Sequence, residues 1–239
     1  MQAIDIYALV GAVSHGVLAL LFVMVARSQR ARGPAWFALT FALLALIYLF
    51  DAQLRPGAEQ RPHPLATVLG TCAAVLMTLG IVEYTNLQGR AARWVRRLTV
   101  AMGAALLIGV PLGATRLMTF GVLALMLTMQ AALALAAARR EPRAGYGLVG
   151  LLLALYPAAF VAATLGWIDI SLLRYVVAIP TAALGMTMLT TGLLRAQRRA
   201  TDELPRREVA DEALHTLNES LEQRLAQRTA ELHDVIAGL

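Results

Sequence analysis

The sequence predicts an all-α polytopic membrane protein, a seven-transmembrane-helix bundle followed by a cytoplasmic coiled-coil helix. Of its 239 residues 59% are hydrophobic and only 15% are charged, a balance that is unusual for a soluble domain. Seven apolar runs, each long enough to cross about 30 Å of hydrocarbon, fill the chain to near residue 194. A polar, heptad-like segment begins only after them, so no length is left for a separate soluble enzyme domain.

The apolar runs give the expected spans in chain order. They lie at 4–26, 34–50, 65–85, 98–114, 117–137, 146–167 and 172–194. Pro111, Pro157 and Pro180 fall inside three of these spans, where a missing backbone donor favours a bend. Small residues at Gly147 and Gly150 allow close helix approach, which predicts a tightly packed bundle.

The basic residues predict the orientation. All 21 are arginine, and the formal net charge is +6. They gather in alternate loops and after the last span, at residues 27, 30 and 32, then 90, 93, 96 and 97, then 139, 140 and 143, then 195, 198 and 199. The positive-inside rule therefore places the N-terminus outside and the C-terminus in the cytoplasm. Because the arginines follow the loops rather than one face, we expect no nucleic-acid binding.

Polar groups within the spans need a reason, because burying them in lipid is costly. His15, with Ser14 beside it, lies in the first span and Gln130 in the fifth. Each is expected to hydrogen-bond to a neighbouring helix, and His15 is more often expected as a packed group than as a pH sensor or a metal ligand. Glu83, at the inner end of the third span, is expected to pair with an inside arginine. The single cysteine, Cys72, offers no metal-ligand set, so no metal site is predicted.

A set of polar residues forms the candidate sensing site. Its members are His15, Tyr48, Asp51, Arg116, Asp169, Arg174 and Tyr175. All of them except His15 lie toward the outer ends of the spans, where charged groups from different helices are able to pair. The alternative is that the aromatic residues anchor the spans at the interface and the charges merely flank them.

The composition changes after Arg199, which divides the chain into a transmembrane domain, 1–199, and a cytoplasmic helix, 200–239. Thr201 and Pro205 bound a segment that resembles a new helix start or a kink. Beyond it, apolar residues recur at steps of three, four, four, seven and four: Leu214, Leu217, Leu221, Leu225, Leu232 and Ile236. This seam predicts a parallel homodimeric coiled coil with a stutter, and the alternative is a helix lying on the membrane.

The tail also resembles a known family. The run LNESLEQRLAQRTAEL at 217–232 is similar to the signalling helix of bacterial sensor histidine kinases and diguanylate cyclases. The following ELHDVIAGL, 231–239, resembles the phosphoacceptor box of histidine kinases in which a His-Asp pair begins the dimerisation helix. The resemblance implies that His233 is the phosphorylated residue and Asp234 the neighbouring acid-base group.

These resemblances imply the sensor region of a two-component histidine kinase in the bacterial inner membrane. The receptor would pass an extracytoplasmic or intramembrane stimulus through the last span to the dimeric coil, and then to a downstream kinase domain or response regulator. No cofactor is expected in this chain, and whether the protein is an enzyme stays open: the 239 residues alone are not expected to be one, whereas a longer protein containing them would be a histidine kinase. ATP and Mg²⁺ would belong to a kinase domain elsewhere in a longer protein.

Other classes of function stay open or are disfavoured. A seven-helix small-molecule transporter would suit proline-bent helices, and the sensor region of a diguanylate cyclase would share the signalling helix. A retinal receptor needs a lysine, and the chain has none. No His-Glu-x-x-His or Gly-x-Ser-x-Gly motif supplies an intramembrane enzyme with a metal or a nucleophile.

Overall fold

The structure, a computed structural model, consists of α-helices throughout the part of the chain that it describes. It describes residues 6–29, 32–53, 64–110, 112–113, 116–142, 145–168 and 170–237, and for some of these, including 226–237, the backbone alone. The helices are α1 (Ile6–Gln29), α2 (Arg32–Gln53), α3 (Pro64–Tyr84), α4 (Gly89–Gly109), α5 (Arg116–Arg140), α6 (Tyr146–Thr164) and α7 (Ile170–Ala237). The all-α prediction is confirmed.

Six of these helices contain segments long and apolar enough to cross a membrane. They are α1, α2, α3, α5, α6 and the part of α7 at Val177–Arg198. Large hydrophobic side chains cover their outward faces, as at Leu20, Leu151 and Ile179, of which 66%, 62% and 76% are exposed. Such exposure is a liability in water and is expected where a helix faces lipid. The protein is therefore an α-helical, polytopic membrane protein.

Helix α4 differs from the other six. Its first half carries Arg90, Arg93, Arg96 and Arg97, and its apolar part begins at Leu98. From there to its end at Gly109 the helix rises by only about 18 Å at 1.5 Å per residue, which is less than the roughly 30 Å of a bilayer core. The seventh crossing, expected at 98–114, stays a prediction.

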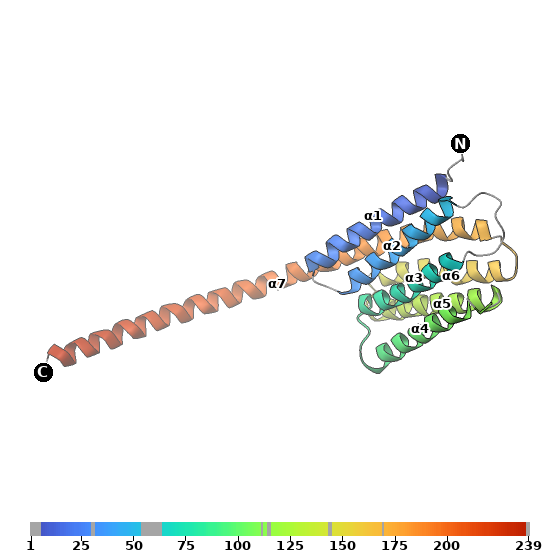
Figure 1. The fold of residues 1–239 in the computed structure, drawn as a ribbon. Helices are drawn as coiled ribbons and strands as arrows, with labels where there is room; N and C mark the ends of the chain where they lie inside the picture. The colour runs from blue at the N-terminus through green and yellow to red at the C-terminus, as the bar shows by residue number, and fades with distance from the viewer. Residues whose placement is uncertain are drawn as a thin grey trace. The chain divides into compact units, whose positions relative to one another are not determined.

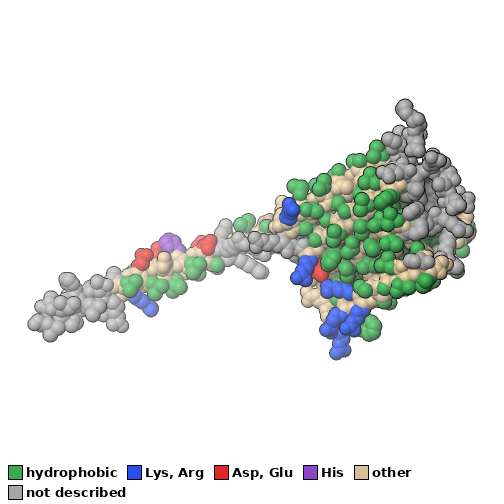
Figure 2. All heavy atoms as spheres, in the orientation of Figure 1, with side chains coloured by type: hydrophobic (Ala, Val, Ile, Leu, Met, Phe, Trp, Pro, Cys, Tyr) green, Lys and Arg blue, Asp and Glu red, His purple; other side chains and the backbone are tan. Residues whose placement is uncertain are grey.

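Successive helices run back and forth through the bundle (Figure 1). The C-terminal ends of α1, α3 and α5 consequently lie at the same end of the bundle as the starts of α2, α4 and α6. In Figure 2 the described arginine side chains of the bundle lie at this end, and hydrophobic side chains cover its flank. The alternation of arginine-rich loops in the sequence is thus matched by the arrangement of the helices.

The bundle core is centred on an aromatic cluster between α1 and α2. Phe22 and Phe41 stack with ring centroids 5.5 Å apart and an interplanar angle of 3°. Phe37 extends the cluster to Tyr84 in α3, with centroids 6.0 Å apart. Leu184 and Met188 of α7, each 1% exposed, belong to the same core. Side chains of α7 therefore hold the first helices of the chain to the last.

Close helix approach occurs at Gly150, as the small residues predict. A Cβ atom there would lie 2.7 Å from Leu135 Cδ2 and 3.1 Å from the backbone nitrogen of Leu135 in α5. At Gly147 a Cβ would meet only Ala138 Cβ, at an ordinary 3.9 Å. Helices α5 and α6 are thus closer at Gly150 than at Gly147, and a side chain at Gly150 would separate them.

The chain divides into two compact units, Met1–Thr191 and Gly192–Leu239. The second unit is the C-terminal part of α7, which remains helical through Thr201 and Pro205 to Ala237. A new helix start at Thr201 is therefore wrong. Since Pro205 lacks a backbone donor but accepts the φ value of a helix, the helix tolerates it at the cost of one hydrogen bond. The domain boundary after residue 199 stays a prediction.

Candidate functional site

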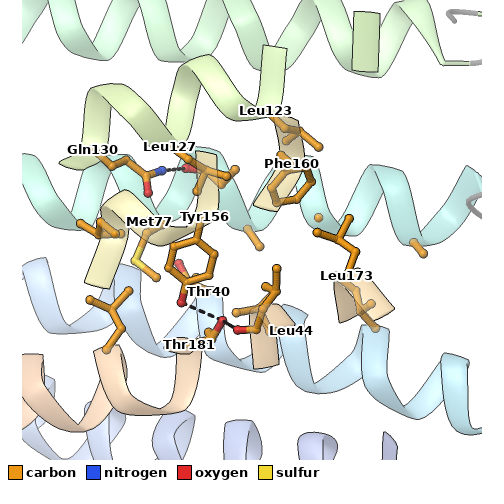
Figure 3. A pocket seen from close by; sticks show the side chains of 18 of the residues that line it. Thr40, Leu44, Met77, Leu123, Leu127, Gln130, Tyr156, Phe160, Leu173 and Thr181 are labelled. Carbon is orange, nitrogen blue, oxygen red and sulfur yellow. Dashed lines mark hydrogen bonds between the residues drawn. The ribbon is translucent and has the colours of Figure 1, made fainter. Parts of the chain in front are cut away.

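A cavity of about 240 Å³ lies inside the bundle and is the candidate functional site (Figure 3). Five helices contribute to its wall, namely α2, α3, α5, α6 and α7. Its lining is mostly apolar, and no described lining residue carries a charge. The polar exceptions are Thr40, Tyr48, Thr67, Gln130, Tyr156 and Thr181. An apolar chamber with a few fixed polar groups is the usual form of a small-molecule site.

Small residues on α3 make the space. Ala66, Gly70, Ala73 and Ala74 contribute to the wall from one face of this helix. At Gly70 an added Cβ would meet only Ile47 Cδ1, at 3.9 Å. Because the opposing side chains do not fill the volume that these small residues leave, the interior departs locally from its normal packing density.

Gln130 of α5 is the central polar group of the wall. It is 0% exposed, and its amide nitrogen donates to the carbonyl of Ala74 at 3.0 Å and to Thr78 Oγ1 at 2.8 Å, both in α3. A carbonyl only accepts, so these bonds fix which end of the amide is the nitrogen. Oε1 then lies toward Met77 and Tyr156 (Figure 3) and accepts no hydrogen bond from the described residues.

The hydroxyl of Tyr156 links α6 to α7 at the cavity. It donates to Thr181 Oγ1 at 2.9 Å, and Thr181 donates in turn to the carbonyl of Val177 at 2.6 Å (Figure 3). Thr40 of α2 likewise donates to the backbone, to the carbonyl of Trp36 at 2.9 Å. Each of these hydroxyls has thereby used its one donor hydrogen, while its oxygen can still accept.

His15 lies beside the cavity rather than in its wall. Its Nδ1 is 2.7 Å from the carbonyl of Gly11, so Nδ1 carries the donated hydrogen. The imidazole ring packs against Tyr48, which lines the cavity, with centroids 5.0 Å apart. Nε2 is buried and has no hydrogen-bond partner among the described residues. The expected hydrogen bond between His15 and another helix is absent there; the ring bonds to its own helix.

The structure places only part of the predicted sensing set. Tyr48 reaches the cavity and His15 packs on it. The structure describes only the backbone of four members of the set, which lie in helices: Asp51, Arg116, Arg174 and Tyr175. Asp169 lies outside the described residues. Pairing among these charges stays a prediction. Sequence analysis missed Tyr156, Thr181 and Thr40, because each was read as part of an apolar run.

The predicted ion pair at the inner end of α3 is confirmed. Arg96 Nη2 of α4 lies 2.8 Å from Glu83 Oε1. Next to it, the hydroxyl of Tyr84 bonds to that of Thr191 in α7, and the hydroxyl of Tyr146 donates to the carbonyl of Tyr84 at 3.0 Å. These contacts join α3, α4, α6 and α7 at the arginine-rich end of the bundle.

The predicted seam of the tail is partly described. Leu214, Leu217, Leu221 and Leu225 are 64%, 55%, 47% and 67% exposed. Leu232, His233, Asp234 and Ile236 fall in α7, where only the backbone is described. The phosphoacceptor role of His233 and Asp234 stays a prediction. No three His, Cys, Asp or Glu side chains come together within the described residues.

The fold and the cavity define the class: a multi-pass α-helical membrane protein with a mostly apolar cavity between its helices. Comparison with known proteins adds nothing narrower, because no family model, curated protein or solved structure matches the chain.

Proposed function

We propose that the chain is the sensory and transmitting part of a membrane receptor in the bacterial inner membrane. A stimulus acting at the bundle shifts α7, and the cytoplasmic part of α7 relays that shift as a homodimeric coil to an output such as a histidine kinase or a response regulator. The arginine-rich end of the bundle supports an N-terminus outside and a C-terminus in the cytoplasm.

One observation carries the proposal: the helix that walls the cavity is the helix that continues into the tail. Leu173, Val177, Thr181 and Leu184 of α7 line the cavity, and the same helix runs on to Ala237. A ligand that contacts these residues differently in two arrangements of α7 biases the equilibrium between them. A difference of about 1–3 kcal/mol is typical of such coupling.

The exposed leucines support the dimer. A single helix with an apolar seam gains little stability alone in water, whereas a second copy of the same seam would cover Leu214, Leu217, Leu221 and Leu225 on both chains. The resemblance of residues 217–232 to a signalling helix favours a kinase output and equally suits a diguanylate cyclase.

Disulfide crosslinking of the full chain in native membranes tests the proposal. Single cysteines replace residues 217, 221, 225 or 223 in a Cys72→Ala background. Residue 223 is the matched control, because two residues advance a helix by about 200° and place it opposite the seam. We expect strong crosslinks at the three leucine positions and weak ones at 223.

A different pattern would overturn the receptor. Equal crosslinking at all four positions would show random collision, and none at any position, with the protein expressed, would exclude the parallel dimer. The second result favours a small-molecule transporter, which the cavity and the prolines inside α6 and α7 also suit.

A further inference from the structure

Four polar groups of the cavity wall, on Thr40, Gln130, Tyr156 and Thr181, have a donor–acceptor imbalance that bears on the ligand. The two hydrogens of the Gln130 amide are donated to α3, and the hydroxyl hydrogens of Tyr156, Thr181 and Thr40 are donated within the protein. None of these four groups has a donor left, but Gln130 Oε1 has no partner among the described residues. The oxygens of Tyr156 and Thr40 also retain lone pairs.

We propose that the cavity binds a small, neutral, largely apolar molecule that carries one hydroxyl or N–H group, and that this group donates to Gln130 Oε1. Leaving this buried oxygen unpaired costs free energy. A ligand with a hydrogen-bond donor removes that cost by bonding to the oxygen, whereas a ligand with acceptors only does not. This proposal rests on the proposed function in one respect only, namely that the bound molecule is the stimulus of the receptor.

Size and charge narrow the class further. The volume of about 240 Å³ lies below the range of roughly 300–1,000 Å³ that suits drug-sized ligands. Anions are disfavoured because no described lining residue carries a charge that would compensate theirs. Molecules with acceptors only, such as ketones and quinones, would place their oxygens against Gln130 Oε1. Medium-chain alcohols and small alkylphenols fit all three conditions.

An isosteric pair of probes tests the donor requirement. Tritiated 2-nonanol is bound to the full chain in lipid nanodiscs and displaced with unlabelled 2-nonanol or with 2-nonanone, which has the same skeleton but no donor. After correction for partition into the lipid, we expect the ketone to compete about tenfold more weakly, the usual effect of leaving one buried polar group unpaired.

Two glycine variants test the location. Gly70→Leu puts a side chain into the cavity and is expected to abolish saturable binding. Gly121→Leu is the matched control, because an added Cβ at that position of α5 meets no atom within 4 Å, and it should bind as the wild type does. Gln130→Met keeps the length of the side chain and removes the acceptor, so the preference for alcohol over ketone should fall to within about twofold.

The proposal is overturned by equal competition from the ketone, by unchanged binding in Gly70→Leu, or by no saturable binding beyond lipid partition. The crosslinking yield at residue 221, measured with and without 2-nonanol, separates it from the receptor proposal. Saturable, donor-selective binding with unchanged crosslinking supports the site and rejects this ligand class as the stimulus. A tail that crosslinks along its seam without alcohol binding retains the receptor and rejects the site.

Discussion

The hydroxyl of Tyr156 in α6 donates a 2.9 Å hydrogen bond to Thr181 Oγ1 in α7, at the wall of the cavity. Tyr156 is 6% exposed and Thr181 is 4% exposed, so water does not compete for either group. The bond ties the helix that continues into the tail to the rest of the bundle. Pro180 precedes Thr181, and the backbone donor missing there makes this part of α7 less constrained by its own ladder.

A double-mutant cycle on this pair measures the link between α6 and α7. We expect Tyr156→Phe and Thr181→Val together to cost less than the sum of the two single changes, by about 0.6 kcal/mol, the average for such bonds in membrane proteins. Unfolding of the purified protein in detergent, followed by circular dichroism, gives the four free energies. Strictly additive costs would show that the hydrogen bond does not contribute to stability.

Much of the fold follows from two patterns in the sequence. Apolar runs predict the helices, because lipid leaves the backbone no partner but itself. Alternating arginine clusters predict which helix ends lie together, because positive loops stay on one side. Helix α4 differs from the expectation, because Arg93, Arg96 and Arg97, expected in the loop before a span, lie inside the helix. Hydropathy alone does not predict where α4 begins, because arginine side chains can extend into water from a helix without ending it.

The site was harder to predict, because its key atoms lie in ordinary membrane residues. Gln130 stood out as an amide within an apolar run. Thr181 and Thr40 did not, because threonines in spans commonly bond to their own helix, as both do here. Tyr156 lies next to Pro157 in an apolar run, and nothing in that run marks it as a cavity residue. Only the helix arrangement brings Tyr156 to Thr181, and single-sequence spacing does not contain that arrangement.

Two glycines of α6 offer a matched test of the α5–α6 contact. Gly150→Ala is expected to lower the free energy of unfolding by about 1–3 kcal/mol, the cost of overpacking, because the new methyl group would lie 2.7 Å from Leu135 Cδ2. Gly147→Ala, one turn away, has room against Ala138 and should change it by less than about 1 kcal/mol. Equal effects of the two in detergent unfolding would contradict the packing.

The Glu83–Arg96 ion pair is expected to contribute little to stability. The side chains are 38% and 46% exposed, so water screens their attraction, and Glu83→Gln should cost less than about 1 kcal/mol. In 1 M NaCl, where the screening length is about 3 Å, the cost should disappear. Arg93→Gln, on the exposed face of α4, is the control. A loss in Glu83→Gln that high salt leaves unchanged would mean that packing, not charge, explains it.

The start of α6 depends on a glycine that packs against α7. Gly145 has a φ of 77°, in the left-handed region, and a Cβ atom there would overlap Thr191 Cγ2. Gly89, with a φ of 76°, has no atom within 4 Å of such a Cβ. Left-handed backbone alone costs an alanine roughly 1–2 kcal/mol, so Gly89→Ala should lose about that much stability and Gly145→Ala clearly more.

A second substitution tests whether the methyl group of Thr191 causes the extra loss of stability, or excess, in Gly145→Ala relative to Gly89→Ala. Thr191→Ser removes Cγ2 but keeps the hydroxyl that bonds to Tyr84. In the Gly145→Ala background it should therefore recover the excess and leave only the cost of the left-handed backbone. Detergent unfolding of the two single variants and the double variant provides the comparison. If Thr191→Ser recovers nothing, the start of α6 does not pack on α7 at this residue, and the cost of Gly145→Ala comes from the backbone alone.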